Sequence, residues 1–241
     1  MSKYYGRLAR RLDKRTLQFA KYTTVSPKVL PEVDNLALVS SRTGIYNYST
    51  LYPMDGNDVI GDCTIAAVAK HITTVNGLVG RVVIPSLGDV VSQYRKMTGG
   101  PDTGLNMLDV MNTFRRTGML GSNILGYVAV NPLNHAHVQQ AIQIFGGVLV
   151  GMRVTTLTEK QFDMQTPWTP APFTGELHEI YCPSYTNTHV SGVTWGGVQL
   201  GTWAWWDYSV DEVYCPMSIE VETFDNFDYD TAMSDLRALA A

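Results

Sequence analysis

The sequence predicts an α+β fold in which a helical N-terminal half packs on a C-terminal antiparallel sheet. Between residues 64 and 145, apolar residues recur at helical spacing in segments that mostly end at glycine. From residue 148 onward, short runs rich in Val, Tyr, Thr and Trp are separated by turns, as in strands. Helices followed by strands are typical of α+β proteins. With 241 residues, 45% of them hydrophobic and 17% charged, the chain can bury a sizeable core as one domain.

The part of the chain before the helices differs in composition. Residues 1–21 carry seven Lys and Arg against one Asp, a net charge of +6 that leaves −10 for the remainder. We expect a short basic amphipathic helix that serves as an arm over residues 1–23. It would bind other protein subunits or, with weaker support, nucleic acid, and a solvated tail or strap is the alternative. Residues 24–55, rich in Pro, Ser, Asn and Tyr, are predicted to form an extended loop over the body.

The predicted helices cover residues 64–75, 86–97, 106–117 and 135–145. The predicted strands cover residues 148–154, 177–182, 189–195, 201–207 and 214–221, with a Thr- and Pro-rich loop at 159–174. Tryptophans alternate within 203–206, which favours core packing beneath the sheet over an exposed binding platform. Residues 223–241 form an acidic tail with a short helix from Thr231. The predicted organisation is therefore an arm (1–23), a main domain (24–222) and a tail (223–241).

Cys63 carries the strongest chemical signal in the chain. It stands where a glycine-containing extended segment turns into the first apolar helix. A helix N-terminus carries a partial positive charge, which favours the nucleophilic thiolate form of a cysteine. Asn57, six residues upstream, is close enough along the chain to supply a side-chain amide donor for an oxyanion. The segment predicts a nucleophile with half an oxyanion hole, and a buried structural thiol is the alternative.

A second block lies in the C-terminal half. Residues 175–181 predict a strand that bears His178, and residues 190–196 predict a further strand that ends in Trp-Gly. A histidine on a strand opposite a cysteine at a helix start is an arrangement suited to nucleophilic catalysis. The cleft would then lie between the helical half and the sheet.

Taken in order, the blocks Asn57 to Thr64, Leu177 to Ile180, Val193 to Gly196 and Thr202 to Asp207 resemble the papain-like cysteine peptidases. Within that superfamily they are similar to a group of bacterial and bacteriophage proteins with an Asn-Asp-x-x-Gly-Asp-Cys-Thr motif. The resemblance covers about residues 50–219. It implies a papain-like fold, with Cys63 as nucleophile, His178 as base and leaving-group acid, and Asn57 in place of the oxyanion-hole glutamine.

Three positions depart from the pattern of that superfamily. The asparagine that orients the histidine is replaced by Val193, which cannot hydrogen-bond an imidazole, and Thr194 is the nearest polar substitute. Asp62 can cap the helix, but its charge beside the thiol would raise the thiol pKa. Glu179 follows the histidine where the superfamily has a small residue.

Two functions follow from these observations. The first is a phage-encoded thiol hydrolase, a peptidase or amidase acting on a peptide substrate through Cys63, His178, Asn57 and Thr194. The second is a non-catalytic structural virion protein, of minor capsid or decoration type, that uses the papain-like body for binding.

Other classes of function have no support in the sequence. Phosphate-binding glycine loops, metal-ligand clusters and dinucleotide fingerprints are absent from it, so no cofactor is expected. Three widely spaced cysteines do not indicate a disulfide framework or a zinc site. The sequence has no apolar run of membrane-spanning length and no secretory signal pattern, so we expect no membrane partner. Synthesis in the cytoplasm is expected, with incorporation into a phage particle in the second case.

Overall fold

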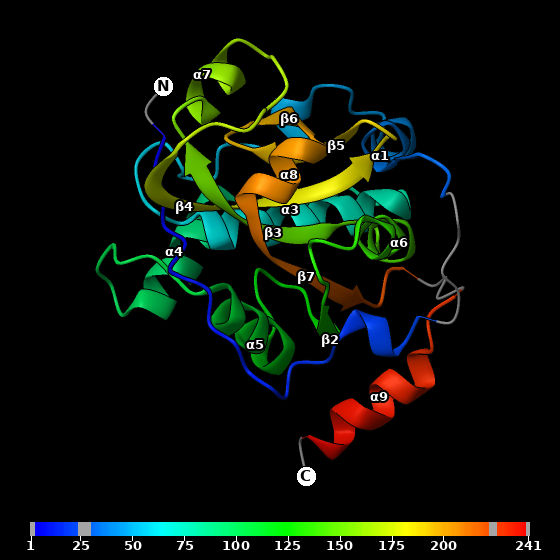
Figure 1. Cartoon of the computed structure of the whole chain (residues 1–241). Coiled ribbons are helices and arrows are strands. Elements are labelled where there is room, and N and C mark those ends of the chain that lie inside the picture. Colours follow the sequence, from blue (N-terminus) through cyan, green and yellow to red (C-terminus); the bar gives the residue numbers. More distant parts are fainter. Residues whose placement is uncertain (1–2, 24–29, 222–225, 240–241) are drawn as a thin grey trace.

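The computed structural model describes residues 3–23, 30–221 and 226–239 (Figure 1). Its centre is an antiparallel sheet in the order β2-β7-β3-β4-β5-β6, with β1 paired to β4. The strands are β1 (Val33–Asp34), β2 (Ile124–Ala129), β3 (Val148–Thr155), β4 (Phe173–Tyr185), β5 (His189–Thr194), β6 (Gly197–Thr202) and β7 (Val210–Ser218). The expected helices-then-sheet class is confirmed.

The helices are η1 (Phe19–Lys21), α1 (Asn35–Thr43), α2 (Tyr48–Leu51), α3 (Cys63–Leu78), α4 (Leu87–Thr98), α5 (Met107–Thr117), α6 (His135–Phe145), α7 (Thr158–Asp163), α8 (Trp203–Ser209) and α9 (Tyr229–Ala238). Successive strand residues point to opposite faces of the sheet, which divides the core in two. Leu149, Tyr181 and Tyr214 pack with α3, α4 and α5. Val150 and Ile180, one position away, pack on the other face with α6 and α8.

The four helices predicted between residues 64 and 145 are α3 to α6. Their ends follow from local chemistry. Ser86, Asn106 and Asn134 accept backbone N–H bonds at the starts of α4, α5 and α6. Glycines with φ of 71–80° close the same three helices, a conformation that costs other residues more.

The strand predicted at 201–207 is wrong beyond residue 202. There the chain turns into α8, whose N-cap Thr202 accepts a hydrogen bond from the Trp205 N–H. Trp205 and Trp206 are buried, as expected, but through a helix rather than through period-two alternation. At Gly201 a Cβ would lie 2.4 Å from the Trp205 ring, so the glycine makes room for that ring. Alternating tryptophans therefore do not distinguish a strand from a helix of two turns.

Several further helices and strands are not predicted from the sequence. The loop expected over residues 24–55 contains α1 and α2, which begin at the side-chain caps Asp34 and Asn47. The loop expected at 159–174 contains most of α7, and β2 was not predicted. The tail helix predicted from Thr231 is present as α9. The predicted boundary between main domain and tail, at 222–223, lies outside the described residues.

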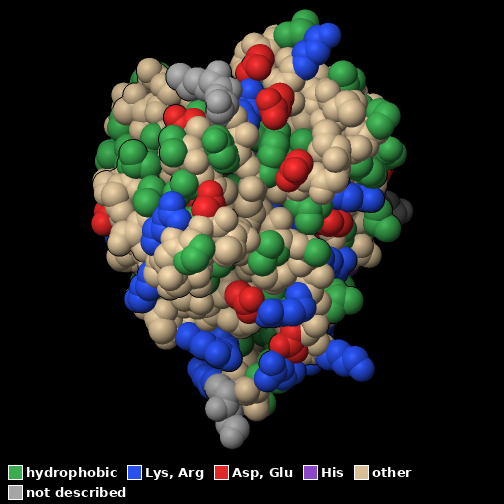
Figure 2. All heavy atoms as spheres, turned by 90° about the vertical axis from the view of Figure 1, so that its left-hand side faces the viewer, with side chains coloured by type: hydrophobic (Ala, Val, Ile, Leu, Met, Phe, Trp, Pro, Cys, Tyr) green, Lys and Arg blue, Asp and Glu red, His purple; other side chains and the backbone are tan. Residues whose placement is uncertain are grey.

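The basic amphipathic helix expected near the N-terminus is wrong. Apart from η1, residues 3–23 have no helix and run over the body as a strap (Figure 1, dark blue). Cations along it pair with carboxylates of the main domain and tail, in the pairs Lys3–Asp163, Arg7–Asp211, Arg7–Glu212, Arg11–Asp109 and Lys21–Asp235. These partners lie on α7, β7, α5 and α9, so an extended chain reaches them where a helix would not. Figure 2 shows basic and acidic side chains intermixed over the lower part of the face along which the strap runs.

Among the described residues, no helix combines the length and apolar character needed to cross a bilayer.

Arg7 is the one of these cations that has no solvent exposure along its side chain. We expect Arg7→Gln to lower the free energy of unfolding by about 3 kcal/mol, because it leaves buried carboxylates without their partner. Arg11→Gln is the matched control, since the Arg11–Asp109 pair is half exposed and worth less than about 1 kcal/mol. Urea denaturation of the three proteins measures the difference. Equal losses in both variants would contradict a special role for Arg7.

Candidate active site

Cys63 is the first residue of α3 and is fully buried. The loop before it is tied to the helix by Lys70, which forms a buried ion pair with Asp55 and donates to the Pro53 carbonyl at 2.7 Å. Asp62 occupies the N-cap position, yet its side chain accepts no N–H of the helix. The start of α3 is therefore fixed by the preceding loop rather than by a side-chain cap.

His178 lies on β4, opposite Met152 of β3, and is also fully buried. Its Nε2 shares a 2.8 Å hydrogen bond with Thr194 Oγ1. The ring stacks on Trp195 at 4.6 Å between centroids and meets the edge of Tyr5 at 5.6 Å. Nδ1 is buried and has no hydrogen-bond partner among the described residues. The ring is thus held by one nitrogen, and the other stays available for a reacting group.

The thiol of Cys63 lies against the strand that carries His178. The backbone N–H of Glu179, the residue after the histidine, interacts with the sulfur, and so does the N–H of Gly6. Burial nevertheless raises the thiol pKa to about 12, with a contribution from the Glu179 charge. Burial also lowers the pKa of His178 to about 3, helped by the nearby charges of Arg7 and Lys70. Near pH 7 both groups are therefore neutral in the folded chain.

Asn57 is buried beside Cys63 in sequence, and its amide is already engaged. Nδ2 donates to Asp62 Oδ1, so one of its two donors is taken by a carboxyl group. Burial raises the pKa of Asp62 to about 7, against the opposing effect of that hydrogen bond. Of the four residues predicted for the site, His178 and Thr194 thus contact each other, and Asn57 contacts the residue before Cys63.

On the helical side of this site, residues 3–9 of the strap are held by backbone hydrogen bonds. The Tyr4 N–H donates to the Asn57 carbonyl at 2.8 Å. Leu105, just before α5, donates its N–H to the Gly6 carbonyl at 2.8 Å and accepts from the Leu8 N–H at 2.9 Å. The strap is therefore bound in extended form, as a peptide ligand would be.

On the sheet side, side chains hold the same residues. Lys3 pairs with Asp163, and the Tyr5 hydroxyl donates to Glu159, both on α7.

Gly6 passes so close to Gly61 that a Cβ on Gly6 would lie 1.6 Å from the Gly61 carbonyl oxygen. A glycine is consequently required at position 6, and the strap shields Cys63 and His178 from water.

Tyr5, Gly6 and Arg7 belong to this site but are not predicted from the sequence. A single glycine in a basic segment gives no local signal, because its partner Gly61 lies 55 positions away. Trp195 belonged to the Trp-Gly block, and its stacking on the histidine could have been anticipated from that position.

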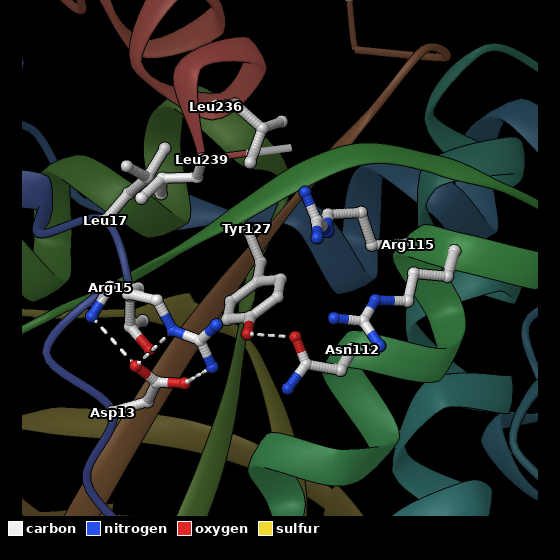
Figure 3. A pocket seen from close by; sticks show the side chains of 10 residues that line it. Asp13, Arg15, Leu17, Asn112, Arg115, Tyr127, Leu236 and Leu239 are labelled. Carbon is white, nitrogen blue, oxygen red and sulfur yellow. Dashed lines mark hydrogen bonds and ion pairs between the residues drawn. The ribbon is translucent and has the colours of Figure 1, made fainter. Parts of the chain in front are cut away.

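A cavity of about 60 Å³ lies elsewhere, between the strap, α5, β2 and α9 (Figure 3). Arg15 is paired with Asp13 there, and the Tyr127 hydroxyl donates to Asn112 at 2.9 Å. None of the candidate site residues lines it. In the part of the chain that the structure describes, no group of three or more His, Cys, Asp or Glu is arranged to hold a metal ion.

The fold is similar to that of xylellain, a cysteine protease from Xylella fastidiosa, whose crystal structure matches with a TM-score of 0.66. The two sequences are 16% identical, and the match covers 90% of this chain and 97% of that chain. The fold is papain-like. That confirms the fold class expected from the order of the sequence blocks, while identity this low establishes the fold alone. No protein-family model matches the sequence, and a search of curated proteins finds no match.

The raised pKa of Asp62 predicts a dependence of stability on pH. The carboxyl keeps its proton up to about pH 7 in the folded chain but loses it near pH 4 when unfolded. Between these values the folded state binds the extra proton, so stability falls as pH rises from about 4 to about 7. We expect Asp62→Asn to remove the contribution of this carboxyl to the slope and to raise stability at pH 8 by on the order of 2–4 kcal/mol.

Urea denaturation at pH 5 and pH 8 measures this effect. Asp58→Asn, in the same loop and half-buried, is the matched control and should keep the slope of the unmodified protein. An Asp62→Asn protein with an unchanged slope would show that Asp62 is ionised in the fold.

Proposed function

We propose that this chain is a thiol hydrolase of the peptidase or amidase type, whose Cys63 and His178 are held closed by its own residues 3–9. The observation that carries the proposal is the joint burial of the two groups beneath a segment bound as an extended peptide. A cleft that binds one extended peptide backbone beside a cysteine and a histidine is suited to bind another.

In the open state, the Cys63 sulfur would attack the carbonyl carbon of a bound amide or ester. His178 would take the thiol proton through Nδ1 and return it to the leaving amine or alcohol, giving an acyl-thioester. Water would then hydrolyse the thioester, with His178 as base, and regenerate the thiol. Thr194 would orient the imidazole through Nε2, in the role that Val193 cannot fill. Asn57 would stabilise the oxyanion with the amide proton that Asp62 does not use.

The closed chain is unsuited to this reaction for three physical reasons. The thiol and imidazole are both neutral because they are desolvated. The group of the strap that faces the sulfur is the Gly6 N–H, rather than a carbonyl carbon. The strap also covers the cleft against water. Displacement of residues 3–9 is thus the activating step in this proposal.

The second candidate is a non-catalytic virion protein of a phage, of minor capsid or decoration type. What supports it is the full burial of Cys63 and the high pKa of its thiol. The basic arm supports it less than its composition suggests, because its cations pair with carboxylates of the same chain. Binding another subunit or nucleic acid through the arm would require exchange of those pairs. Mass spectrometry of purified particles tests this candidate.

Opening the cleft should expose the thiol. We expect the full-length Gly6→Ala protein to react with iodoacetamide at Cys63 at least tenfold faster than the unmodified chain, because the new Cβ cannot fit against Gly61. Cys182 and Cys215 are buried and serve as internal controls. Labelling sites and rates are read by mass spectrometry.

Two further variants decide whether the exposed thiol is activated. Gly88→Ala is the matched control, since a Cβ there meets only Ser86 Oγ at 3.7 Å, and it should leave labelling unchanged. Adding His178→Ala to Gly6→Ala should slow labelling at pH 6–7 several-fold, because the imidazole no longer takes the proton. Equal labelling rates of Cys63 with and without His178 would contradict the hydrolase proposal and favour a structural thiol.

A further inference from the structure

Three neighbouring strands place two glutamates on either side of a glycine. In the antiparallel register, Gly151 of β3 pairs with Glu179 of β4 on one side and with Glu212 of β7 on the other. Both glutamates are 2% exposed. Glu179 contributes to the raised pKa of the Cys63 thiol, so this row lies beside the thiol. The result is a slot with acidic walls and a floor that lacks a side chain.

The guanidinium of Arg7 lies in this slot. Nη1 is 3.2 Å from a Glu212 carboxylate oxygen, and Nη2 is 2.9 Å from Asp211 and 3.3 Å from the Met152 carbonyl oxygen. A Cβ on Gly151 would lie 2.8 Å from Nη1 and 3.0 Å from Cζ of Arg7. Glycine at position 151 is therefore what lets the planar group lie on the strand.

The slot holds more acceptors than Arg7 uses. Glu179 Oε2 is buried and has no hydrogen-bond partner among the described residues. Burial raises the pKa of both glutamates, and their mutual repulsion raises that of Glu179 further, while Arg7 lowers both. The Tyr214 hydroxyl also donates to Glu212 at 2.9 Å. An empty slot would leave buried carboxyl groups beside the thiol with no cation among them.

Granting the hydrolase proposed above, we infer that this slot is its specificity pocket, and that the enzyme acts on extended polypeptides carrying an arginine next to a glycine. The glycine is required where the peptide passes Gly61, and the arginine enters between Glu179 and Glu212. In the closed chain Gly6 and Arg7 occupy both positions, so residues 3–9 represent the kind of peptide that the cleft accepts.

The geometry favours arginine over lysine. The guanidinium is a rigid planar fork with several donors, and here it reaches two carboxylates and a carbonyl at once. A single ammonium group could not reach all three from one position. A neutral side chain would leave the carboxylates unpaired, which costs more than the lost contacts alone.

Binding and turnover are measured separately. The binding protein is the full-length chain with Gly6→Ala, which opens the cleft, and Cys63→Ser, which prevents turnover. The probe is a fluorescein-labelled peptide with the sequence of residues 3–9, followed by anisotropy. Peptides with Gln or Lys in place of its arginine, and with Val in place of its glycine, are compared with it.

We expect the arginine peptide to bind at least tenfold more tightly than the glutamine and valine peptides, with the lysine peptide between them. Adding Glu212→Gln or Glu179→Gln should reduce the preference for arginine at least threefold, whereas Asp109→Asn, remote from the slot, should leave it unchanged. If Gly6→Ala disturbs folding, as shown by a lost thermal transition, Arg7→Gln in the full chain opens the slot instead.

Equal binding of the arginine and glutamine peptides, or no binding to either opened protein, would overturn the inference. Cleavage of the peptides by the Gly6→Ala protein with Cys63 intact is followed by mass spectrometry. Cleavage without regard to arginine would keep the hydrolase and overturn the pocket. Arginine-selective binding without cleavage would support the pocket and count against the hydrolase.

Discussion

The close approach of Gly6 to Gly61 is the contact on which the state of the whole site depends. Because a Cβ at position 6 would overlap the Gly61 carbonyl, a glycine there lets the strap lie deep between the helical half and the sheet. In that position the strap buries Cys63 and His178 and places Arg7 in its slot. Burial in turn shifts both reactive groups toward their neutral forms. A steric constraint at one backbone position thus sets the electrostatics of the cleft.

Several buried carboxyl groups lie around the same cleft, and they differ in their partners and in their protonation. Asp55 is paired with Lys70, whereas Asp62 accepts a hydrogen bond from the Asn57 amide and retains its proton to about pH 7. Glu179 and Glu212 share the charge of one arginine across a glycine. Removing solvent raises the cost of every unpaired negative charge, so proton uptake, pairing and displacement of the strap are linked. Chemistry at Cys63 would be governed by these neighbours as much as by the helix N-terminus.

What sequence could predict here was local. The helices α3 to α6 follow from apolar periodicity and from caps within a few residues, and Thr194 was the nearest polar group to the histidine in the Trp-Gly block. The composition of residues 1–21 predicts a basic helix instead of the strap, because the partners that hold the strap extended, among them Asp163 and Glu212, lie more than 150 positions away. The slot depends on strand register, because a shift of one residue in β3 would put Val150 or Met152 in place of the glycine between Glu179 and Glu212. Neither the path of the strap nor the slot produces a periodic pattern in the sequence.

A strap that fits its cleft this closely raises the question of how the cleft could open. Pulling Arg7 out alone would leave Glu179 and Glu212 buried without a cation, which is costly in a desolvated site. Exchange is different, because an incoming guanidinium restores the pairs as the outgoing one is released, and the strap's cations regain water. The net cost of opening is then mainly the backbone contacts of residues 4–9, which an extended peptide also replaces. The buried carboxylates would therefore disfavour neutral ligands, and the same carboxylates would allow an arginine-bearing ligand to enter by exchange with Arg7.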